Sequence, residues 1–291
     1  MAATLPSTLP FKKGTLTWRV AREPIVGLAA TPTLLLQVAH PLVAAGVRTY
    51  SDFEQNPWGR LWRTLDITLK LAFAEPKVSK RQETTLRAIH ARVQGTSSEG
   101  VPYRALDPEL LLWVWATLVH GALDTYERMF GRLSDADRDR YCEEQKLIAH
   151  AAGVPEGRCP SGYTEFRAYL DRMIGTELRA TDVARSVIAV GIRPPVIWPI
   201  RPLAGRMNRL SIGLLPAGLR DELLAANGLE WSPADERALG RLLALSRLMV
   251  RLVPRPLREL PTRYLVARRK PMRLFQRRAS RYTTKQDRLA S

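Results

Sequence analysis

The sequence of 291 residues has few of the residue types that form covalent cross-links or metal clusters. It contains two cysteines, Cys142 and Cys159, and four histidines. Two cysteines at this separation are too few for a disulfide scaffold and do not form the CxxC pair of a zinc site. A chain of this length buries enough surface to fold without either device. We therefore expect a globular protein in a reducing compartment.

Several enzyme motifs are also missing. The sequence has no Gly-rich phosphate loop, no GxSxG elbow, no HExxH motif and no Glu-x-x-His pair. Hydrolase and nucleotide-binding hypotheses therefore lose support. No continuous apolar stretch resembling a secretory signal occurs near the N-terminus. The longest apolar stretch, residues 31–47, is at the lower limit for a membrane span and contains two prolines, so we interpret it as a buried helix. We expect a cytoplasmic protein without a transmembrane helix.

Helix start and stop signals dominate the chain. Asp107 and Pro108 provide an N-cap and a first helical residue for a long apolar helix that ends at about Phe130, before Gly131. Strand patterns joined by Asn-Gly or Asp-Gly turns are missing. Helices are expected over residues 57–73, 78–93, 108–130, 135–152, 162–180, 201–212, 216–226 and 232–253. The sequence predicts an all-α protein, a single large multi-helix bundle with a basic C-terminal helical extension.

The expected domain organisation follows from proline and charge. Four prolines between residues 194 and 202 interrupt the helical pattern, which predicts a sub-boundary at residues 191–202. Leucine-rich helical spacing then continues, so we expect one helical domain over residues 15–255 and a basic tail over residues 256–291.

Positive charge is concentrated at the C-terminal end. The net charge is +17, and residues 201–291 carry +13 of it. The density peaks in a run formed by Arg268, Arg269, Lys270, Arg273, Arg277, Arg278 and Arg281. Such a run attracts an anionic membrane or a nucleic acid, or is only a solvated tail. Nucleic acid is the weaker hypothesis, because no helix-turn-helix, zinc-finger or RNA-recognition signature accompanies the charge.

Histidine-dependent chemistry has four candidates. His90 lies beside the apolar stripe of its predicted helix, where an imidazole either binds a metal or is a hydrogen-bonded, half-buried side chain. His40 precedes Pro41 in an apolar segment, so it is expected to be buried with a polar partner. His120 has an ordinary explanation as the i,i+4 neighbour of an aspartate, and His150 as a residue at a helix C-terminus.

A second polar cluster lies near the start of the helix predicted at residue 57. Arg60, Arg63 and Thr64 fall on one helix face at i, i+3 and i+4. Two cations and a hydroxyl can bind an anion, a cofactor carboxylate or an oxygen intermediate. The simpler alternative is a surface arginine pair beside a threonine that bonds its own helix carbonyl.

Seven segments in one order resemble the family that contains the latex clearing proteins, which are bacterial rubber oxygenases, and the fungal oxygenase MpaB. They are Gln37–Gly46, Asn56–Thr64, Ile89–Gly95, Tyr103–Glu109, Leu112–Leu118, Leu133–Asp135 and Gly153–Pro155. The resemblance implies an all-α fold, a b-type haem and cleavage of carbon–carbon double bonds by dioxygen. It implies that His90 is the haem ligand and that Arg60 and Thr64 lie beside the haem.

Two departures from the family pattern accompany the resemblance. Arg63 stands where latex clearing proteins place a distal lysine, and a permanently charged guanidinium cannot act as a base or a reversible iron ligand. Trp115 replaces a histidine that many relatives have. His120 is five helical residues away and lies on another face, so it cannot replace that histidine. His40 is the next candidate for the cofactor if His90 fails.

The resemblance leads to a functional hypothesis and a rival. The first is a haem b oxygenase that acts on an isoprenoid or another apolar alkene, with arginines pairing the haem propionates and the basic C-terminus reaching an anionic membrane. Its substrate channel would be lined by Trp58, Trp62, Trp113 and Trp115, unless these are plain core residues. The rival is a degenerate, non-catalytic helical protein that binds anionic lipid or nucleic acid.

Overall fold

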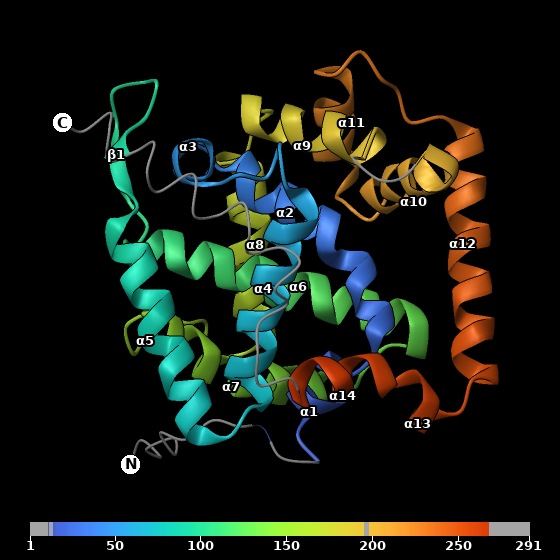
Figure 1. Ribbon diagram of the computed structural model, residues 1–291, viewed down its shortest axis with the longest axis horizontal. Coiled ribbons are helices and arrows are strands. Elements are labelled where there is room, and N and C mark those ends of the chain that lie inside the picture. The colour runs from blue at the N-terminus through green and yellow to red at the C-terminus, as the bar shows by residue number, and fades with distance from the viewer. Residues whose placement is uncertain (1–10, 12–13, 195–197, 268–291) are drawn as a thin grey trace.

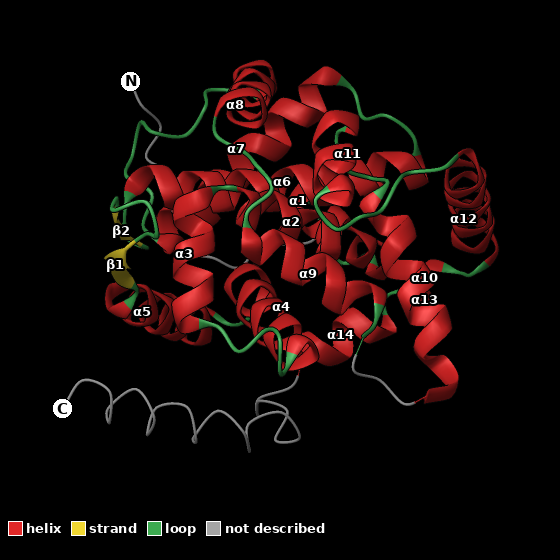
Figure 2. Ribbon diagram, turned by 90° about the horizontal axis from the view of Figure 1, so that it is seen from above, coloured by secondary structure: helices red, strands yellow, loops and turns green. Residues whose placement is uncertain are grey.

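The computed structural model describes residue 11 and residues 14–194 and 198–267, and its helices surround one central helix, α6 (Figures 1 and 2). The N-terminal elements are α1 (Leu16–Ala21), the 3-10 helix η1 (Pro24–Ala29), α2 (Ala30–Ala39), α3 (Pro41–Tyr50), α4 (Pro57–Phe73), α5 (Pro76–Arg92), β1 (Gln94–Thr96) and β2 (Pro102–Arg104). Next come α6 (Pro108–Phe130), α7 (Asp135–Ala152), α8 (Tyr163–Thr176) and α9 (Asp182–Ile192). The C-terminal elements are η2 (Trp198–Ile200), α10 (Arg201–Ile212), α11 (Ala217–Ala225), α12 (Pro233–Leu252), α13 (Arg255–Arg258) and α14 (Leu260–Ala267).

The prediction of an all-α protein is confirmed. The basic run from Arg268 to Arg281 lies outside the described residues. The bounds of α4, α6 and α10 agree with the sequence prediction because their local signals are strong. Asp107 accepts a hydrogen bond from the amide of Glu109 at 2.8 Å, and Gly131 ends α6 with a φ of 93° that favours glycine.

Three sequence expectations are wrong in detail. Residues 31–47 do not form one helix, since α2 and α3 meet at His40, whose extended backbone follows from the proline after it. The helix expected over 162–180 ends at Thr176, and α9 was missed although Thr181 caps it. A short antiparallel hairpin, β1 and β2, pairs Gly95 with Tyr103 in a region where no strand was expected.

The core is organised around α6. This helix packs against η1, α2, α7 and α12, and Trp113 in its second turn is fully buried. A Cβ atom at Gly121 would collide with the hydroxyl of Thr33, so this glycine permits the close approach of α2. No helix in the described ranges is by itself long and apolar enough to cross a membrane. In the part of the chain that the structure describes, the bent pair Pro24–Ala39 and Pro41–Tyr50, at 106°, is the only pair that meets the length and composition of a span.

Both ends of the described chain meet beside α1. Arg258 donates to both carboxylate oxygens of Glu23, at 3.0 and 2.9 Å, and both side chains are largely buried. The neighbouring residues Arg22 and Glu259 also form an ion pair. Buried charges of this kind require partners, so α13 and α14 are fixed to the N-terminal segment.

Candidate functional site

The candidate site lies between α4 and α5, which pack along each other (Figure 1). The start of α4 is fixed locally. Asn56 accepts a hydrogen bond from the amide of Gly59 at 3.0 Å, and Pro57 occupies the first helical position. A Cβ atom at Gly59 would collide with the Asn56 side chain. These contacts set the direction in which the polar residues of the first two turns project.

Arg60 interacts with both Thr64 and His90. The Thr64 hydroxyl accepts a hydrogen bond from the Arg60 guanidinium and donates to the Arg60 carbonyl at 3.1 Å. Burial lowers the pKa of His90, and the positive charge of Arg60 lowers it further. Burial and the charge of Arg63 likewise lower the pKa of Arg60. The His90 imidazole is therefore neutral at pH 7, which is the form that binds metals.

The His90 ring lacks the partner that a structural histidine ordinarily has. Its Nδ1 atom is buried and makes no hydrogen bond. Leaving a buried polar atom without a partner costs about 1–3 kcal/mol. Among the described ion pairs, none includes Arg60. A neutral imidazole therefore lies within the electrostatic influence of a guanidinium that forms none of the ion pairs among the described residues.

The side chains of α4 are incompletely covered by neighbouring elements. Every residue from 60 to 69 is half-buried, including Leu61, Trp62 and Leu65. A helix packed on one face alternates between buried and exposed residues. This alternation is missing in α4, so its apolar side chains near the polar cluster are only partly covered by other elements.

Arg63 belongs to a different interaction from Arg60. Its guanidinium forms an ion pair with Asp52, which precedes α4 and also accepts a hydrogen bond from Asn56. The pair links the segment before α4 to the helix. Asp52 was not identified in the sequence, because nothing in its local pattern shows that the chain turns back on α4.

His40 serves a structural role at the junction of α2 and α3. It is buried, and its Nδ1 accepts a hydrogen bond from the amide of Leu42 at 3.2 Å, which caps α3. Burial lowers its pKa, and Glu177 partly opposes this. The charge of Arg60 lowers the pKa of His90. The pKa of His40 is instead influenced by the charges of Glu177, Arg179 and Asp107, so the two imidazoles have different surroundings.

Trp115 belongs to the core. Its ring is buried, its Nε1 donates to the carbonyl of Gln145 at 3.0 Å, and it makes an edge-on contact with Phe166. Trp113 is fully buried as well, so neither tryptophan lines an open channel. Trp62 is half-buried on α4, whereas the side chain of Trp58 lies outside what the structure describes.

The remaining histidines have local partners. The Nδ1 atom of His150 lies 2.9 Å from the carbonyl oxygen of Val154, at the end of α7. Burial lowers the pKa of His120, and Asp124, one turn away, opposes the shift. Within the described part of the chain, no cluster of three His, Cys, Asp or Glu residues suited to a metal ion is present. Cys142 and Cys159 are free thiols, and burial raises their pKa values to about 12 and about 11.

Comparison with known proteins identifies the class. Residues 18–250 match the family described as ER-bound oxygenase mpaB/B'/Rubber oxygenase, catalytic domain, and this chain belongs to that family. The resemblance inferred from the seven sequence segments is thereby confirmed. The family is one of oxygenase catalytic domains of the MpaB and rubber-oxygenase type.

Individual relatives agree with this assignment. The proteins Rv2237 of Mycobacterium tuberculosis and Mb2261 of Mycobacterium bovis are each 35% identical to this chain over 168 residues. The match covers 57% of this chain and 64% of each relative, which is less than two thirds of their length. The structure of latex clearing protein LCP in the closed state aligns with a TM-score of 0.55 at 18% identity, covering 87% of this chain and 71% of that one. This likeness shows a shared fold.

Proposed function

We propose that this protein is a haem b-dependent oxygenase that cleaves carbon–carbon double bonds of an isoprenoid or another apolar alkene. Family membership supports the reaction class. The observation that carries the proposal is the neutral imidazole of His90, whose buried Nδ1 has no partner and whose pKa is lowered by burial and by the charge of Arg60.

The residues between α4 and α5 fit a site with one protein ligand. A haem iron can be held by a single axial imidazole, which one histidine supplies. His90 would bind the iron, and Arg60, positioned by Thr64, would offer its charge to a propionate or to a developing negative charge. Bound haem would supply the activation of dioxygen. The half-buried apolar side chains of α4 would contact the ring and the substrate.

The first experiment is an ultraviolet–visible spectrum of protein expressed with a haem precursor. We expect a Soret band that disappears in His90→Ala. His150→Ala is the matched control, since the Nδ1 atom of His150 already has a partner in the carbonyl of Val154, just after α7. Circular dichroism of each variant shows whether it is folded.

Two outcomes would contradict this proposal. A wild-type protein without a Soret band would exclude haem. An unchanged band in His90→Ala would exclude His90 as the ligand and direct attention to His40.

A second candidate function is a non-catalytic member of the family. Trp115, which stands where the family resemblance implies a histidine, fills the core with its N–H satisfied, so this position offers no ligand. A wild-type spectrum without haem, together with binding to anionic lipid, would favour this candidate. Nucleic acid stays the weaker partner.

A membrane surface is the proposed location of the substrate. Leu245, Leu248 and Leu252 form a stripe on α12 and are 58%, 49% and 66% exposed. Arg241 and Arg251 on the same helix are exposed. An apolar stripe with adjacent arginines is typical of a helix that lies on an anionic membrane. The family description, which names an ER-bound oxygenase, agrees with such a location.

Sedimentation with vesicles of phosphatidylserine and phosphatidylcholine tests this location. We expect binding at physiological salt that falls in the double variant Leu248→Glu with Leu252→Glu. Val78→Glu, an exposed apolar position on α5, is the control. Absence of vesicle binding by the wild-type protein would exclude the membrane.

A further inference from the structure

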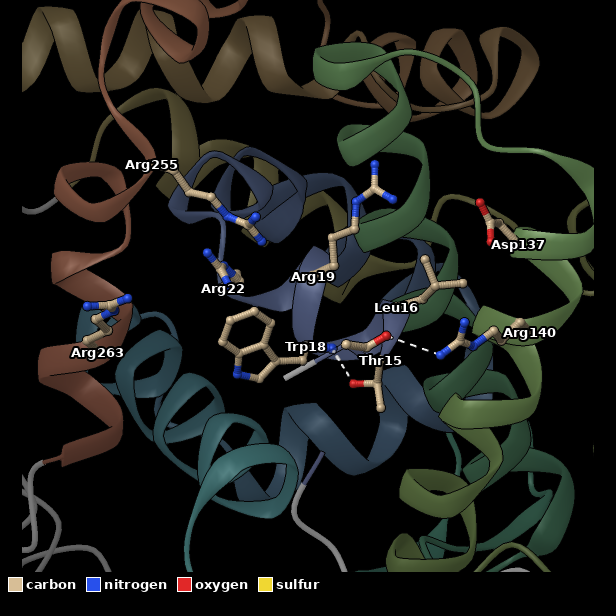
Figure 3. Close-up of a pocket in the computed structure, with 10 residues that line it drawn as sticks. Thr15, Leu16, Trp18, Arg19, Arg22, Asp137, Arg140, Arg255 and Arg263 are labelled. Atoms are coloured by element: carbon tan, nitrogen blue, oxygen red, sulfur yellow. Dashed lines mark hydrogen bonds between the residues drawn. The ribbon is translucent and has the colours of Figure 1, made fainter. Parts of the chain in front are cut away.

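A cavity lies where α1 meets α7, α13 and α14. It has a volume of about 490 Å³, within the range of small-molecule sites. Figure 3 shows Trp18 near its centre, with Arg22, Arg255 and Arg263 on one side and Asp137 on the other. Arg19 and Arg140 also line it. The cavity is therefore mainly cationic.

One carboxylate serves three of these arginines. Glu259 is almost fully buried and forms ion pairs with Arg22, with Arg255 at 2.9 Å and with Arg263 at 3.2 Å. One negative charge neutralises one guanidinium, so the three arginines keep two surplus positive charges. The other nearby carboxylate, Glu23, accepts hydrogen bonds from two guanidinium nitrogens of Arg258, so it does not remove this surplus.

Arg22 is built into the wall of the cavity. Its side chain is 9% exposed, its guanidinium lies 3.7 Å from the centre of the Trp18 ring, and its Nε is buried without a partner. Burial and the charges of Arg255, Arg263 and Arg258 lower its pKa to about 10, with Glu23 opposing them. A buried donor without an acceptor and a like-charge cluster are both stabilised by a bound anion.

Access from solvent is provided by the other two arginines. The side chains of Arg255 and Arg263 are 53% and 59% exposed, and Figure 3 shows them on α13 and α14 at the edge of the cavity. An anion can thus contact the two exposed guanidiniums together with the buried Arg22.

We propose that this cavity binds a phosphate or diphosphate group of a small molecule, through Arg22, Arg255 and Arg263 against Trp18. Two surplus charges match a doubly charged oxyanion better than a single carboxylate, and arginine forks suit phosphate oxygens. The volume leaves space for the organic part of the ligand beside Trp18 and Leu16. The site does not depend on haem, and its test does not use oxygenase activity.

Isothermal titration calorimetry with pyrophosphate, inorganic phosphate and acetate, at constant ionic strength, tests the site. We expect pyrophosphate to bind most tightly and acetate not to bind. The double variant Arg255→Gln with Arg263→Gln weakens pyrophosphate binding at least about tenfold, because each charge-assisted hydrogen bond contributes about that factor or more. Glu259 keeps Arg22 in this variant, so the fold is retained, and circular dichroism checks it.

The matched control is Arg206→Gln with Arg237→Gln. It removes the same number of charges from exposed positions on α10 and α12, outside the cavity. Pyrophosphate affinity within twofold of wild type in this control, with loss in the cavity variant, supports the site. Equal weakening in both variants would reduce the effect to net charge and overturn the proposal, as would absence of pyrophosphate binding together with absence of lipid-phosphate binding.

A short-chain phosphatidic acid, used below its micelle concentration, separates the two sources of a phosphate group. Tighter binding than pyrophosphate, lost in the same cavity variant, identifies a lipid headgroup as the ligand. Weaker binding than pyrophosphate identifies a free phosphorylated metabolite. Either result supports the cavity as a phosphate site.

Discussion

Arg63 is neutralised by Asp52, a residue eleven positions earlier that lies outside α4. The two arginines of the polar cluster therefore differ in function, although they lie one helical turn apart. The ion pair of Arg63 links the segment before α4 to the helix, whereas the charge of Arg60 lowers the pKa of His90. Arg63, for which the family resemblance implies a lysine, is thus held by a carboxylate.

The ion pair predicts a measurable coupling. Asp52→Asn and Arg63→Gln should each lower the free energy of unfolding, by roughly 0.5–1 kcal/mol, because the pair is only partly shielded from solvent. The double variant should lose less than the sum of the two. Urea unfolding of all four proteins checks this, and strictly additive losses would show that the two side chains do not interact.

Capping by His40 predicts a dependence of stability on pH. Its folded-state pKa is lowered by burial, so the unfolded chain binds the proton more readily. The associated stability is complete above pH 6.5 and is lost as the pH falls from 6.5 toward the lower folded-state value. His40→Asn keeps a capping acceptor that does not titrate. Its free energy of unfolding should therefore fall less than that of the wild type between pH 7.5 and pH 5.

Urea unfolding at pH 7.5 and pH 5 measures this difference. His40→Ala is the companion variant, and it should lose about 1 kcal/mol at pH 7.5 through loss of the cap. An identical pH response in wild type and His40→Asn would contradict the role given to the imidazole.

Asp235 is expected to be one of the acidic residues whose substitution lowers the free energy of unfolding most. It accepts hydrogen bonds from Arg209 at 3.0 and 2.8 Å, and it completes the capping box of α12 with Ser232. Arg209 holds its pKa well below the usual range, so this contribution is present at neutral pH and is lost only in strong acid. Asp235→Asn should cost roughly 3 kcal/mol in thermal or urea unfolding.

Asp221→Asn provides the comparison for Asp235. Asp221 is exposed and pairs with the adjacent Arg220, so its loss should change stability by less than about 1 kcal/mol. Comparable losses at both positions would show that burial of the Asp235 pair contributes nothing.

The packing of Trp115 predicts what happens when this residue is replaced by the histidine that the family resemblance implies. Trp115→His would empty part of a packed core and remove the hydrogen bond to Gln145, so we expect destabilisation by about 3 kcal/mol. We also expect no Soret band in His90→Ala combined with Trp115→His. Recovery of the band would instead place the iron beside α6.

The fold was predictable where the controlling signals are local. Pro57, Asp107 and Gly131 mark helix ends within one turn, and those ends are confirmed. The break at His40 also had a local signal in Pro41, but the apolar run on both sides favoured a continuous helix. The division into residues 15–255 and 256–291 stays a prediction.

The site was predictable only in part, because its contacts join distant segments. The family resemblance selected Arg60, Thr64 and His90, and their roles stay predictions. The pairing of Arg63 depends on a loop that no periodicity describes. Likewise, Glu23 and Arg258 are 235 positions apart, and no spacing rule connects them.

The meeting of the chain ends beside α1 also orders events during synthesis. Glu23 is almost fully buried against Arg258, which leaves the ribosome only when the rest of the helical bundle has already emerged. Until then the Glu23 carboxylate, which lies just after α1, lacks this partner, so α1 can complete its packing only after α13 has been made. A chain shortened to the family-matched residues 18–250 would never complete this step.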